Sequence, residues 1–355
     1  MNIPLINKIV FAKNSSVYLN KLKSEALQIR EKNELLAVSP QNTFHHWLGI
    51  KNAALGLFPD NLLILPQQYS NSLLTHGDLE KLASFLANLN FKGIVYNGFP
   101  EYFVEIIKVV HKANSAVKQY LLFAGPASEY CDYDQRRKVA IAVDLCRSNA
   151  IFKLGFNKKG LAEAFSEIYN IRTGSYMVKT KHTLSVPKTI KDSTEPQIGV
   201  FGSDNFNKNL HTQVIAALMI KNSVVHVLDK KVFSYLQTDR IKDENGLMEH
   251  ERFVQKLRDM DICLYLSFSE SWGLVATESL SVGTPCLTTG NSDIYDYDDY
   301  LQKYLVVQDY DNVLSIKKQI DMVLSDYAEL SRRTIEYSKR LHDIADIKLQ
   351  EFLDN

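Results

Sequence analysis

Two glutamates, Glu270 and Glu278, flank the start of a predicted helix in the second half of the chain. A buried strand follows Asp261 and ends in a polar turn at Ser267–Ser271, after which the helix starts near Trp272. Glu270 lies in the turn, and Glu278 lies more than one helical turn further on, roughly 6–8 Å along the axis. Because a carboxylate accepts hydrogen bonds from neighbouring hydroxyl groups, this spacing suits a nucleotide sugar lying along the helix entrance.

The start of this helix also favours an anion. Its first backbone N–H groups have no intrahelical acceptor, and the helix dipole attracts negative charge to the same place. Gly273 allows a ligand to approach the main chain closely. We therefore predict that Trp272, Gly273 and Leu274 cradle a diphosphate through their main chain, and we include Ser271 in the same binding set.

The two glutamates and their surroundings resemble a known family. Glu270-x7-Glu278, within Ser-x-x-Glu-Ser-Trp-Gly-Leu…Glu-Ser-Leu-Ser-x-Gly-Thr-Pro, resembles the E-x7-E signature of retaining GT-B glycosyltransferases of the glycosyltransferase family 4 (group 1) type. The resemblance covers the chain from Ile198 onward. It implies two Rossmann-like α/β domains facing across a cleft, and transfer of a hexose from a nucleotide sugar to an acceptor hydroxyl with retention at the anomeric carbon. We expect Glu270 to orient the donor sugar and Glu278 to hold the ribose.

A second match opens the same region. Ile198-Gly-Val-Phe-Gly-Ser-Asp-Asn-Phe-Asn-Lys-Asn-Leu is similar to the family's element whose basic residues contact the donor diphosphate. Lys208 matches the lysine of that element, Gly202 its glycine turn, and Ser203 stands near the place of a missing arginine. The resemblance therefore implies that Gly202, Ser203 and Lys208 bind the donor, and that Lys208 stabilises the charge of the departing diphosphate.

Each of these residues also has a purely structural interpretation. Glu278 would then be a solvated helix residue, Glu270 a helix cap, Lys208 a surface lysine and Trp272 a packing residue. The glycosyltransferase interpretation itself has two alternatives. One is a non-catalytic GT-B-like partner subunit of a glycosyltransferase complex, which the missing arginine favours. The other is a sugar-nucleotide epimerase or a phosphorylase on the same architecture.

Strand-like and helix-like segments alternate along most of the chain, which is typical of α/β folds with parallel sheets. The predicted strands lie at Lys8–Ala12, within Arg30–Val38, and at Leu62–Leu65, Gly93–Tyr96, Gln119–Ala124, Ala150–Leu154, Ile198–Phe201, Val224–Leu228, Ile262–Ser267 and Cys286–Thr289. We predict an acceptor-side domain at 1–180, a linker at 181–197, a nucleotide-sugar-binding domain at 198–330 and a C-terminal helix at 331–355 that packs back towards the first domain.

The first domain lacks one feature that the resemblance would supply. The family commonly has a glycine-rich loop after the first strand, whereas Phe11-Ala-Lys-Asn-Ser-Ser-Val contains no glycine. Either Asn14, Ser15 and Ser16 donate hydrogen bonds in its place, or this loop faces the acceptor. Asn97–Pro100 is a second loop at a strand end, either facing the cleft or forming a plain turn.

Composition narrows the class of protein. The 355 residues include 41 Lys plus Arg and 41 Asp plus Glu, so the formal net charge is +0. The chain therefore lacks the overall positive electrostatic field that is typical of a dedicated nucleic-acid-binding protein. The start of the chain lacks the pattern of a secretory signal, and no apolar run reaches the roughly 18 residues that span a bilayer. We expect a cytoplasmic protein, and a peripheral contact with the inner face of the membrane is compatible with this.

The expected ligands are a nucleotide-sugar donor, with UDP as the carrier, and a carbohydrate, lipid-linked or glycoconjugate acceptor. We predict no cofactor and no metal ion. Asp-x-Asp triplets hold divalent metals in the other major glycosyltransferase fold, but three occur here, beginning at Asp132, Asp259 and Asp296, which shows how unspecific the pattern is. Oligomeric state cannot be read from the sequence.

Overall fold

Parallel strands form both sheets of the protein. The computed structural model describes residues 5–41, 45–66, 74–181, 195–246 and 248–354. The chain divides into two units, Met1–Lys181 with Lys348–Asn355, and His182–Ile347. Each unit contains a six-stranded sheet in which all strand pairs are parallel, and this confirms the predicted fold class of two parallel α/β domains.

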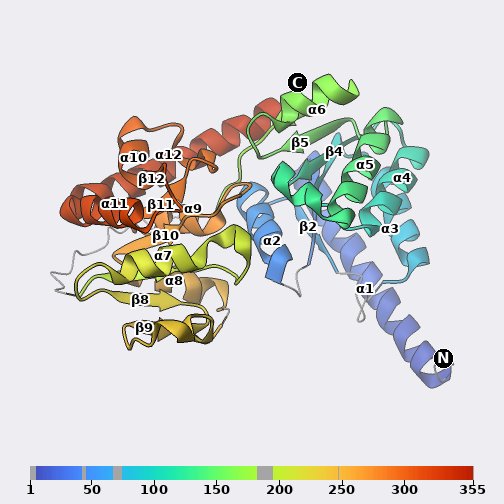
Figure 1. Cartoon of the computed structure of the whole chain (residues 1–355). Helices are drawn as coiled ribbons and strands as arrows, with labels where there is room; N and C mark the ends of the chain where they lie inside the picture. The colour runs from blue at the N-terminus through green and yellow to red at the C-terminus, as the bar shows by residue number, and fades with distance from the viewer. Residues whose placement is uncertain (1–4, 42–44, 67–73, 182–194, 247, 355) are drawn as a thin grey trace. The chain divides into compact units, whose positions relative to one another are not determined.

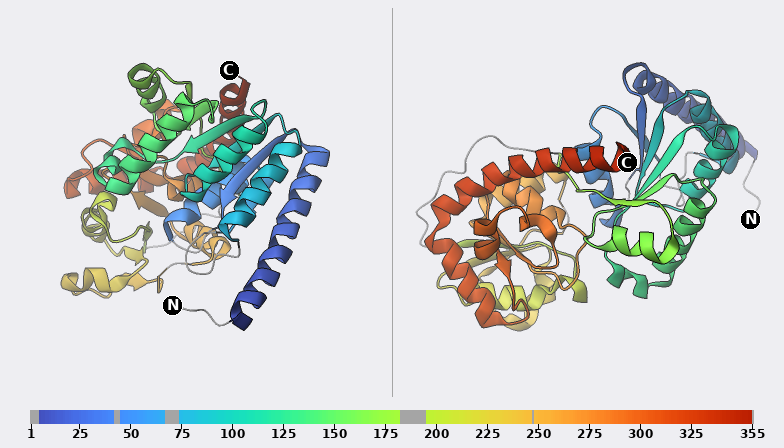
Figure 2. Two further views of the ribbon diagram at one scale, coloured as in Figure 1. Left: turned by 90° about the vertical axis from the view of Figure 1, so that its right-hand side faces the viewer. Right: turned by 90° about the horizontal axis from the view of Figure 1, so that it is seen from above.

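The first unit has the strand order β2-β1-β3-β4-β5-β6. Figure 1 labels β2, β4 and β5 of this sheet. Its strands are β1 (Leu35–Pro40), β2 (Leu62–Leu65), β3 (Gly93–Asn97), β4 (Lys118–Phe123), β5 (Lys153–Phe156) and β6 (Thr173–Ser175). Its helices are α1 (Leu5–Lys32), α2 (His45–Leu57), α3 (His76–Asn88), α4 (Tyr102–Ala113), η1 (Ala127–Cys131), α5 (Tyr133–Arg147) and α6 (Leu161–Tyr169). Helices α1, α3 and α4 pack side by side (Figure 2).

The second unit has the strand order β12-β11-β10-β7-β8-β9. Its strands are β7 (Gln197–Val200), β8 (Val224–Val227), β9 (Ile241–Asp243), β10 (Ile262–Tyr265), β11 (Cys286–Thr289) and β12 (Val306–Val307). Its helices are η2 (Phe206–Lys208), α7 (Leu210–Leu218), η3 (Lys230–Leu236), α8 (His250–Asp259), α9 (Leu274–Ser281), η4 (Asp293–Tyr295), α10 (Asp299–Leu305), α11 (Val313–Ser325) and α12 (Tyr327–Asp354). Strands such as β11 are buried along their whole length, as expected where helices cover both faces of a parallel sheet.

The predicted first strand is wrong. Lys8–Ala12 lies in the long helix α1, and the first strand is β1, which overlaps the strand predicted within Arg30–Val38 and extends beyond it to Pro40. A short apolar run has no clear period, so it does not separate a strand from a buried helical segment. The predicted glycine-free loop at Asn14–Ser16 is helical for the same reason. No ligand-binding loop begins there.

The predicted loop at Asn97–Pro100 begins with a residue that has a structural contact. Asn97 is buried at the end of β3, and its amide donates to the main-chain carbonyl of Ile50 at 2.8 Å, so it holds α2 against the sheet. Most of the predicted linker at 181–197 falls outside the described residues. Among the described residues, no helix combines the length and the apolar character that crossing a membrane requires.

A buried carboxylate fixes the start of α3 against α1. Asp78 is 7% exposed, and its carboxylate accepts hydrogen bonds from Ser15 and from the hydroxyl and main chain of Thr75. Thr75 in turn accepts from the main-chain N–H of Asp78, which completes a capping box. Burial alone would raise the pKa of Asp78, but these hydrogen bonds outweigh it and lower the pKa to about 2.

The lowered pKa of Asp78 predicts an acid-dependent loss of stability. Because the folded state holds this carboxylate ionised below its ordinary pKa of 3.8, the contribution is present above that pH and disappears as the pH falls towards 2. We expect Asp78→Asn to lower the free energy of unfolding by about 2 kcal/mol near neutral pH, and by about half as much near pH 3. Urea unfolding at both pH values measures this. Asp60→Asn, at an exposed position in the same unit, is the control, and an equal effect of Asp78→Asn at both pH values would contradict the prediction.

Candidate active site

The loops that follow β7 and β10 lie at the same edge of the second sheet. These strands are parallel neighbours, with Ile198 opposite Ile262 and Val200 opposite Leu264. Their carboxyl ends therefore meet, and ligands of open α/β sheets bind at such ends. One loop carries Lys208 and the other carries Glu270.

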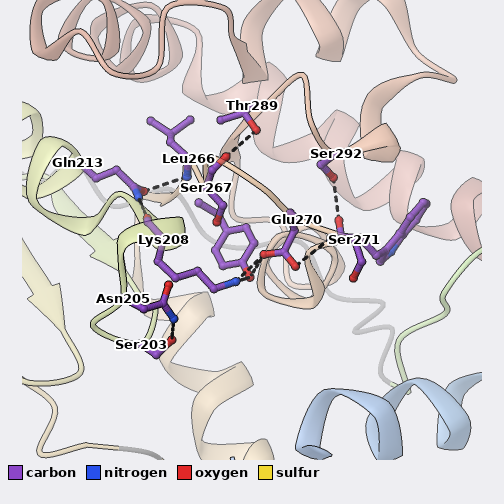
Figure 3. Close-up of polar contacts among 12 residues, drawn as sticks. Ser203, Asn205, Lys208, Gln213, Leu266, Ser267, Glu270, Ser271, Thr289 and Ser292 are labelled. Atoms are coloured by element: carbon purple, nitrogen blue, oxygen red, sulfur yellow. Dashed lines mark hydrogen bonds and ion pairs between the residues drawn. The ribbon is translucent and has the colours of Figure 1, made fainter. Parts of the chain in front are cut away.

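Lys208, Tyr265 and Glu270 form a closed cluster of hydrogen bonds. The Lys208 ammonium donates to Glu270 Oε2 at 2.6 Å, as Figure 3 shows, and to the Tyr265 hydroxyl at 2.9 Å. The Tyr265 hydroxyl donates to the same Glu270 oxygen at 2.7 Å. The side chains of Lys208 and Glu270 are 21% and 15% exposed, so the ion pair is reachable from solvent but partly desolvated. The structure thus brings together the two residues that the sequence predicted as catalytic.

Gln213, on α7, forms hydrogen bonds with the loop after β7 and with the loop after β10, and so connects them. Its amide donates to the main-chain carbonyl of Lys208 at 2.7 Å and accepts from the main-chain N–H of Leu266 at 3.0 Å (Figure 3). The N–H of Phe268 also donates to the carbonyl of Asn207 at 2.8 Å. Because Gln213 is 1% exposed, its hydrogen bonds are shielded from water and fix the position from which the Lys208 side chain extends.

Helix α9 starts beside this cluster, as predicted. Gly273 precedes it with φ +93°, a left-handed conformation that favours glycine, and a Cβ atom there would lie 3.2 Å from the Tyr265 ring. The N–H of Ser271 donates to Glu270 Oε1 at 3.2 Å, so this amide orients the carboxylate. Trp272 is 3% exposed, which favours packing over stacking on a ligand for its side chain. The main-chain cradle at Trp272–Leu274 stays a prediction.

Glu278 is buried within α9 and has a partner that the sequence did not reveal. Its Oε1 lies 2.7 Å from Nε2 of His250, the first residue of α8, and its side chain is 7% exposed. Glu278 is therefore not a solvated helix residue. Burial is the main cause that raises the pKa of Tyr265 well above 10, and the charges of Glu270 and Glu278 both add to it. The two glutamates thus act on one buried hydroxyl.

The remaining predicted residues lie in the loop after β7. Gly202 is packed closely, since a Cβ atom there would lie 2.9 Å from a methyl group of Leu210. The Ser203 hydroxyl accepts a hydrogen bond from the side chain of Asn205 at 2.8 Å. Ser203 supplies no positive charge where the family has its arginine. Contact of Gly202 and Ser203 with a donor stays a prediction.

Sequence reasoning missed Tyr265, Gln213 and His250. Each acts through a tertiary contact, and no local pattern marks Gln213 or His250. Tyr265 offers a weak signal, because a tyrosine is the one residue with a polar tip in the apolar run Ile262–Leu266.

Tyr265 gives a test of the cluster. Tyr265→Phe removes a hydroxyl that donates to Glu270 and accepts from Lys208, and leaves the ring that packs near Gly273. We expect the variant to fold and kcat for sugar transfer to fall by about tenfold, equivalent to about 1.4 kcal/mol of lost positioning of Glu270. Steady-state kinetics at saturating donor measures this. An unchanged kcat would show that Lys208 and the N–H of Ser271 position the carboxylate without the Tyr265 hydroxyl.

The Asp-x-Asp triplets contain residues with structural contacts. Asp132 and Asp298 cap the starts of α5 and α10, and Asp261 accepts from the main-chain N–H of Gln197 at 2.8 Å. That no metal binds at the triplets stays a prediction. Among the described residues, one group has side chains close enough to hold a metal ion, namely His76, Glu80 and Glu105. It belongs to the first unit and not to the cluster around Lys208.

Comparison with known proteins is informative for the second unit and for the fold. Residues 185–341 match the family described as "Glycosyl transferases group 1". No curated protein sequence matches the chain. Among solved structures, Anabaena HepE in complex with UDP and glucose is similar over 89% of this chain and 98% of its own, with 14% identity and a TM-score of 0.63.

Two synthases show the same likeness. Sucrose-phosphate synthase from Thermosynechococcus elongatus has 12% identity over 89% of this chain and 97% of its own, with a TM-score of 0.61. The UDP-forming α,α-trehalose-phosphate synthase from Burkholderia xenovorans, in complex with glucose-6-phosphate, has 11% identity over 90% and 99%, with a TM-score of 0.58. At these identities the structures show the fold. Together with the family match they agree with the resemblance drawn from the sequence: the chain has the GT-B fold, and residues 185–341, almost all in its second unit, match the group 1 glycosyl transferase domain.

Proposed function

We propose that the protein transfers a hexose from a UDP-sugar to an acceptor hydroxyl, with retention at the anomeric carbon. The observation that carries the proposal is the cluster of Lys208, Tyr265 and Glu270 beside the start of α9. The structural relatives support UDP as the carrier, because one is in complex with UDP and another is UDP-forming. Retention rests on the resemblance of the E-x7-E segment.

The hydrogen-bonding capacity of the cluster suits a donor diphosphate. An ammonium group has three N–H donors, and Glu270 and Tyr265 take two of those of Lys208 within the described residues. The third can donate to a phosphate oxygen while the ion pair stays intact. The N–H groups at the start of α9 add main-chain donors on the same anion, and the helix dipole favours its charge.

Glu270 also has a hydrogen-bond acceptor site left with which it can bind a sugar. A carboxylate has about four acceptor sites, and Lys208, Tyr265 and the N–H of Ser271 use three of them. The remaining site, on Oε1, can accept a hydrogen bond from a hydroxyl of the donor hexose. In Glu278, Oε1 lies within hydrogen-bond distance of Nε2 of His250, so Oε2 can accept a hydrogen bond from a ribose hydroxyl.

In the reaction, the bond between the anomeric carbon and the diphosphate breaks and negative charge grows on the diphosphate. Lys208 and the amides of Trp272–Leu274 stabilise that charge, an electrostatic contribution that is large in partly desolvated sites. The resemblance implies that the departing phosphate accepts the acceptor's proton, so no side-chain base is required. We place the reaction in the cytoplasm, near the inner face of the membrane, with a carbohydrate, lipid-linked or glycoconjugate acceptor in surface polysaccharide or glycoconjugate synthesis.

Ligand binding by the full chain tests the proposal. A ligand that binds the native state alone raises the unfolding midpoint, and at 100 times its Kd it adds about 2.7 kcal/mol to the free energy of unfolding. We expect UDP and one or more UDP-sugars to raise the midpoint, and release of UDP from the bound UDP-sugar to be detectable with water as a slow acceptor. A midpoint unmoved by UDP and by every UDP-sugar would overturn the proposal and favour the non-catalytic partner subunit.

A further inference from the structure

An exposed aromatic ring lies next to the candidate active site. Phe206 is 83% exposed, although it follows β7 by only a few residues and precedes Lys208 by two. Its ring stacks on Phe268 with centroids 5.0 Å apart and an interplanar angle of 27°. Phe268 contacts Tyr310 in turn, with centroids 5.9 Å apart. We call Phe206, Phe268 and Tyr310 the aromatic ladder.

The aromatic ladder is held by hydrogen bonds from four loops. The N–H of Phe268 donates to the carbonyl of Asn207, and the side chain of Asn291 donates to the carbonyl of Phe268 at 2.7 Å and to the Tyr310 hydroxyl at 3.3 Å. Asn209 donates to the carbonyl of Tyr310 at 2.8 Å. The outer ring is thus an exposed surface on an ordered support.

The ladder lies within reach of both charged residues of the candidate site. Phe206 and Lys208 are two residues apart, and so are Phe268 and Glu270, so each pair of Cα atoms is separated by at most roughly 7 Å. The supporting residues Asn291 and Tyr310 follow β11 and β12, at one side of the sheet. His250, the partner of Glu278, is instead the first residue of α8, which begins after β9, the strand at the opposite edge, and leads to β10.

This arrangement gives the bound donor a direction. With the ribose at Glu278 and the hexose at Glu270, the donor runs from the α8 side towards the ladder. The ladder then lies beyond the hexose, where the acceptor must approach. An aromatic ring carries a partial negative charge on its face, and it attracts the polarised C–H groups on the apolar face of a sugar ring while excluding water.

We propose that the aromatic ladder is a stacking subsite for a saccharide ring of the acceptor, with Phe206 as the contact residue. The inference rests on the proposed function, since it takes the donor position from it. It specifies the acceptor as a carbohydrate, or a glycoconjugate with a sugar at its accepting end.

A glycan array of neutral oligosaccharides tests the subsite with the full chain in the presence of saturating UDP. We expect the wild type to be retained on a subset of the saccharides, and Phe206→Ala to lose about tenfold in apparent affinity for them. Phe206→Tyr keeps a ring and should retain binding. Tyr297→Ala removes another exposed aromatic side chain of the same unit, 41% exposed, and should leave retention unchanged.

Calorimetric titration with UDP separates the inference from the proposed function. All four proteins should bind UDP with the same Kd, because the ladder lies beyond the diphosphate. Weaker UDP binding by Phe206→Ala would mean that the ring stacks on the nucleobase, and equal glycan retention by Phe206→Ala and wild type would mean that the ring has no ligand. Either result, or a wild type that binds UDP but no saccharide, overturns the subsite. A wild type that does not bind UDP overturns the proposed function instead.

Discussion

Replacing Lys208 with methionine should lower kcat for sugar transfer by roughly 10²–10³-fold, the range found when one preorganised donor to a developing anion is removed. The family's arginine is absent and Ser203 stands near its place, so Lys208 is the cation that we assign to the departing diphosphate. Of the groups that we assign to that charge, its removal leaves the main-chain amides of Trp272–Leu274. It also leaves Glu270 without the ammonium that holds Oε2. UDP release from a saturating UDP-sugar measures kcat, and titration with UDP measures the loss in ground-state affinity.

The chain offers a matched control for Lys208→Met. Lys256 pairs with Glu244 at 2.6 Å in the same unit, and the two side chains are 19% and 13% exposed, close to the values for Lys208 and Glu270. Lys256→Met therefore removes an equivalent ion pair and should destabilise the unit by a similar amount, while its kcat stays near that of the wild type. If both variants lost activity in proportion to stability, Lys208 would have only a structural role.

The sequence predicted the second unit well because its signals are local. The segment from Ile262 to Thr289 alternates a buried apolar run, a polar turn, a helix closed by Gly283 and a second apolar run, and the structure has β10, α9 and β11 at these places. Parallel strand pairing then requires the loops after β7 and β10 to meet. The meeting of Lys208 with Glu270 follows from that topology.

What the sequence did not predict depends on contacts between distant segments. His250 and Glu278 are 28 residues apart in sequence, and Lys208 and Tyr265 are 57 apart, so no window of local pattern contains either pair. The strands β6, β9 and β12 have only two or three residues each and derive their stability from the neighbouring strand. The strand prediction at Lys8–Ala12 was wrong for another reason, because a short apolar run is equally compatible with a strand and with a buried helix.

Phe352→Ala should lower the free energy of unfolding of the first unit by about 3–5 kcal/mol, the usual result of deleting a buried phenylalanine ring. The last residues of α12, from Lys348, belong to that unit, and Phe352 is 2% exposed. Its ring lies edge-on to Tyr120 with centroids 5.7 Å apart. Gly155 and Gly174 form the slot, since a Cβ atom on either would lie about 3 Å from the ring.

Lys153 closes the same slot. It is 6% exposed, its ammonium donates to the main-chain carbonyl of Phe352 at 2.8 Å, and burial lowers the pKa of this lysine. A cation at the C-terminal end of a helix is stabilised by the helix dipole. This contact therefore stabilises both the Lys153 ammonium and the end of α12. Loss of the Phe352 ring should therefore loosen the end of α12 as well as open a cavity. Hydrogen exchange of the β5 amides would report this together with urea unfolding.

Ile347→Ala is the control for Phe352→Ala, because Ile347 lies on the same helix and is 57% exposed. We expect it to change the free energy of unfolding by at most about 0.5 kcal/mol. If Phe352→Ala had an effect as small as that of Ile347→Ala, the end of α12 would not be anchored in the first unit. A large effect of Phe352→Ala with unchanged UDP affinity would show that this anchoring is separate from the donor site of the second unit.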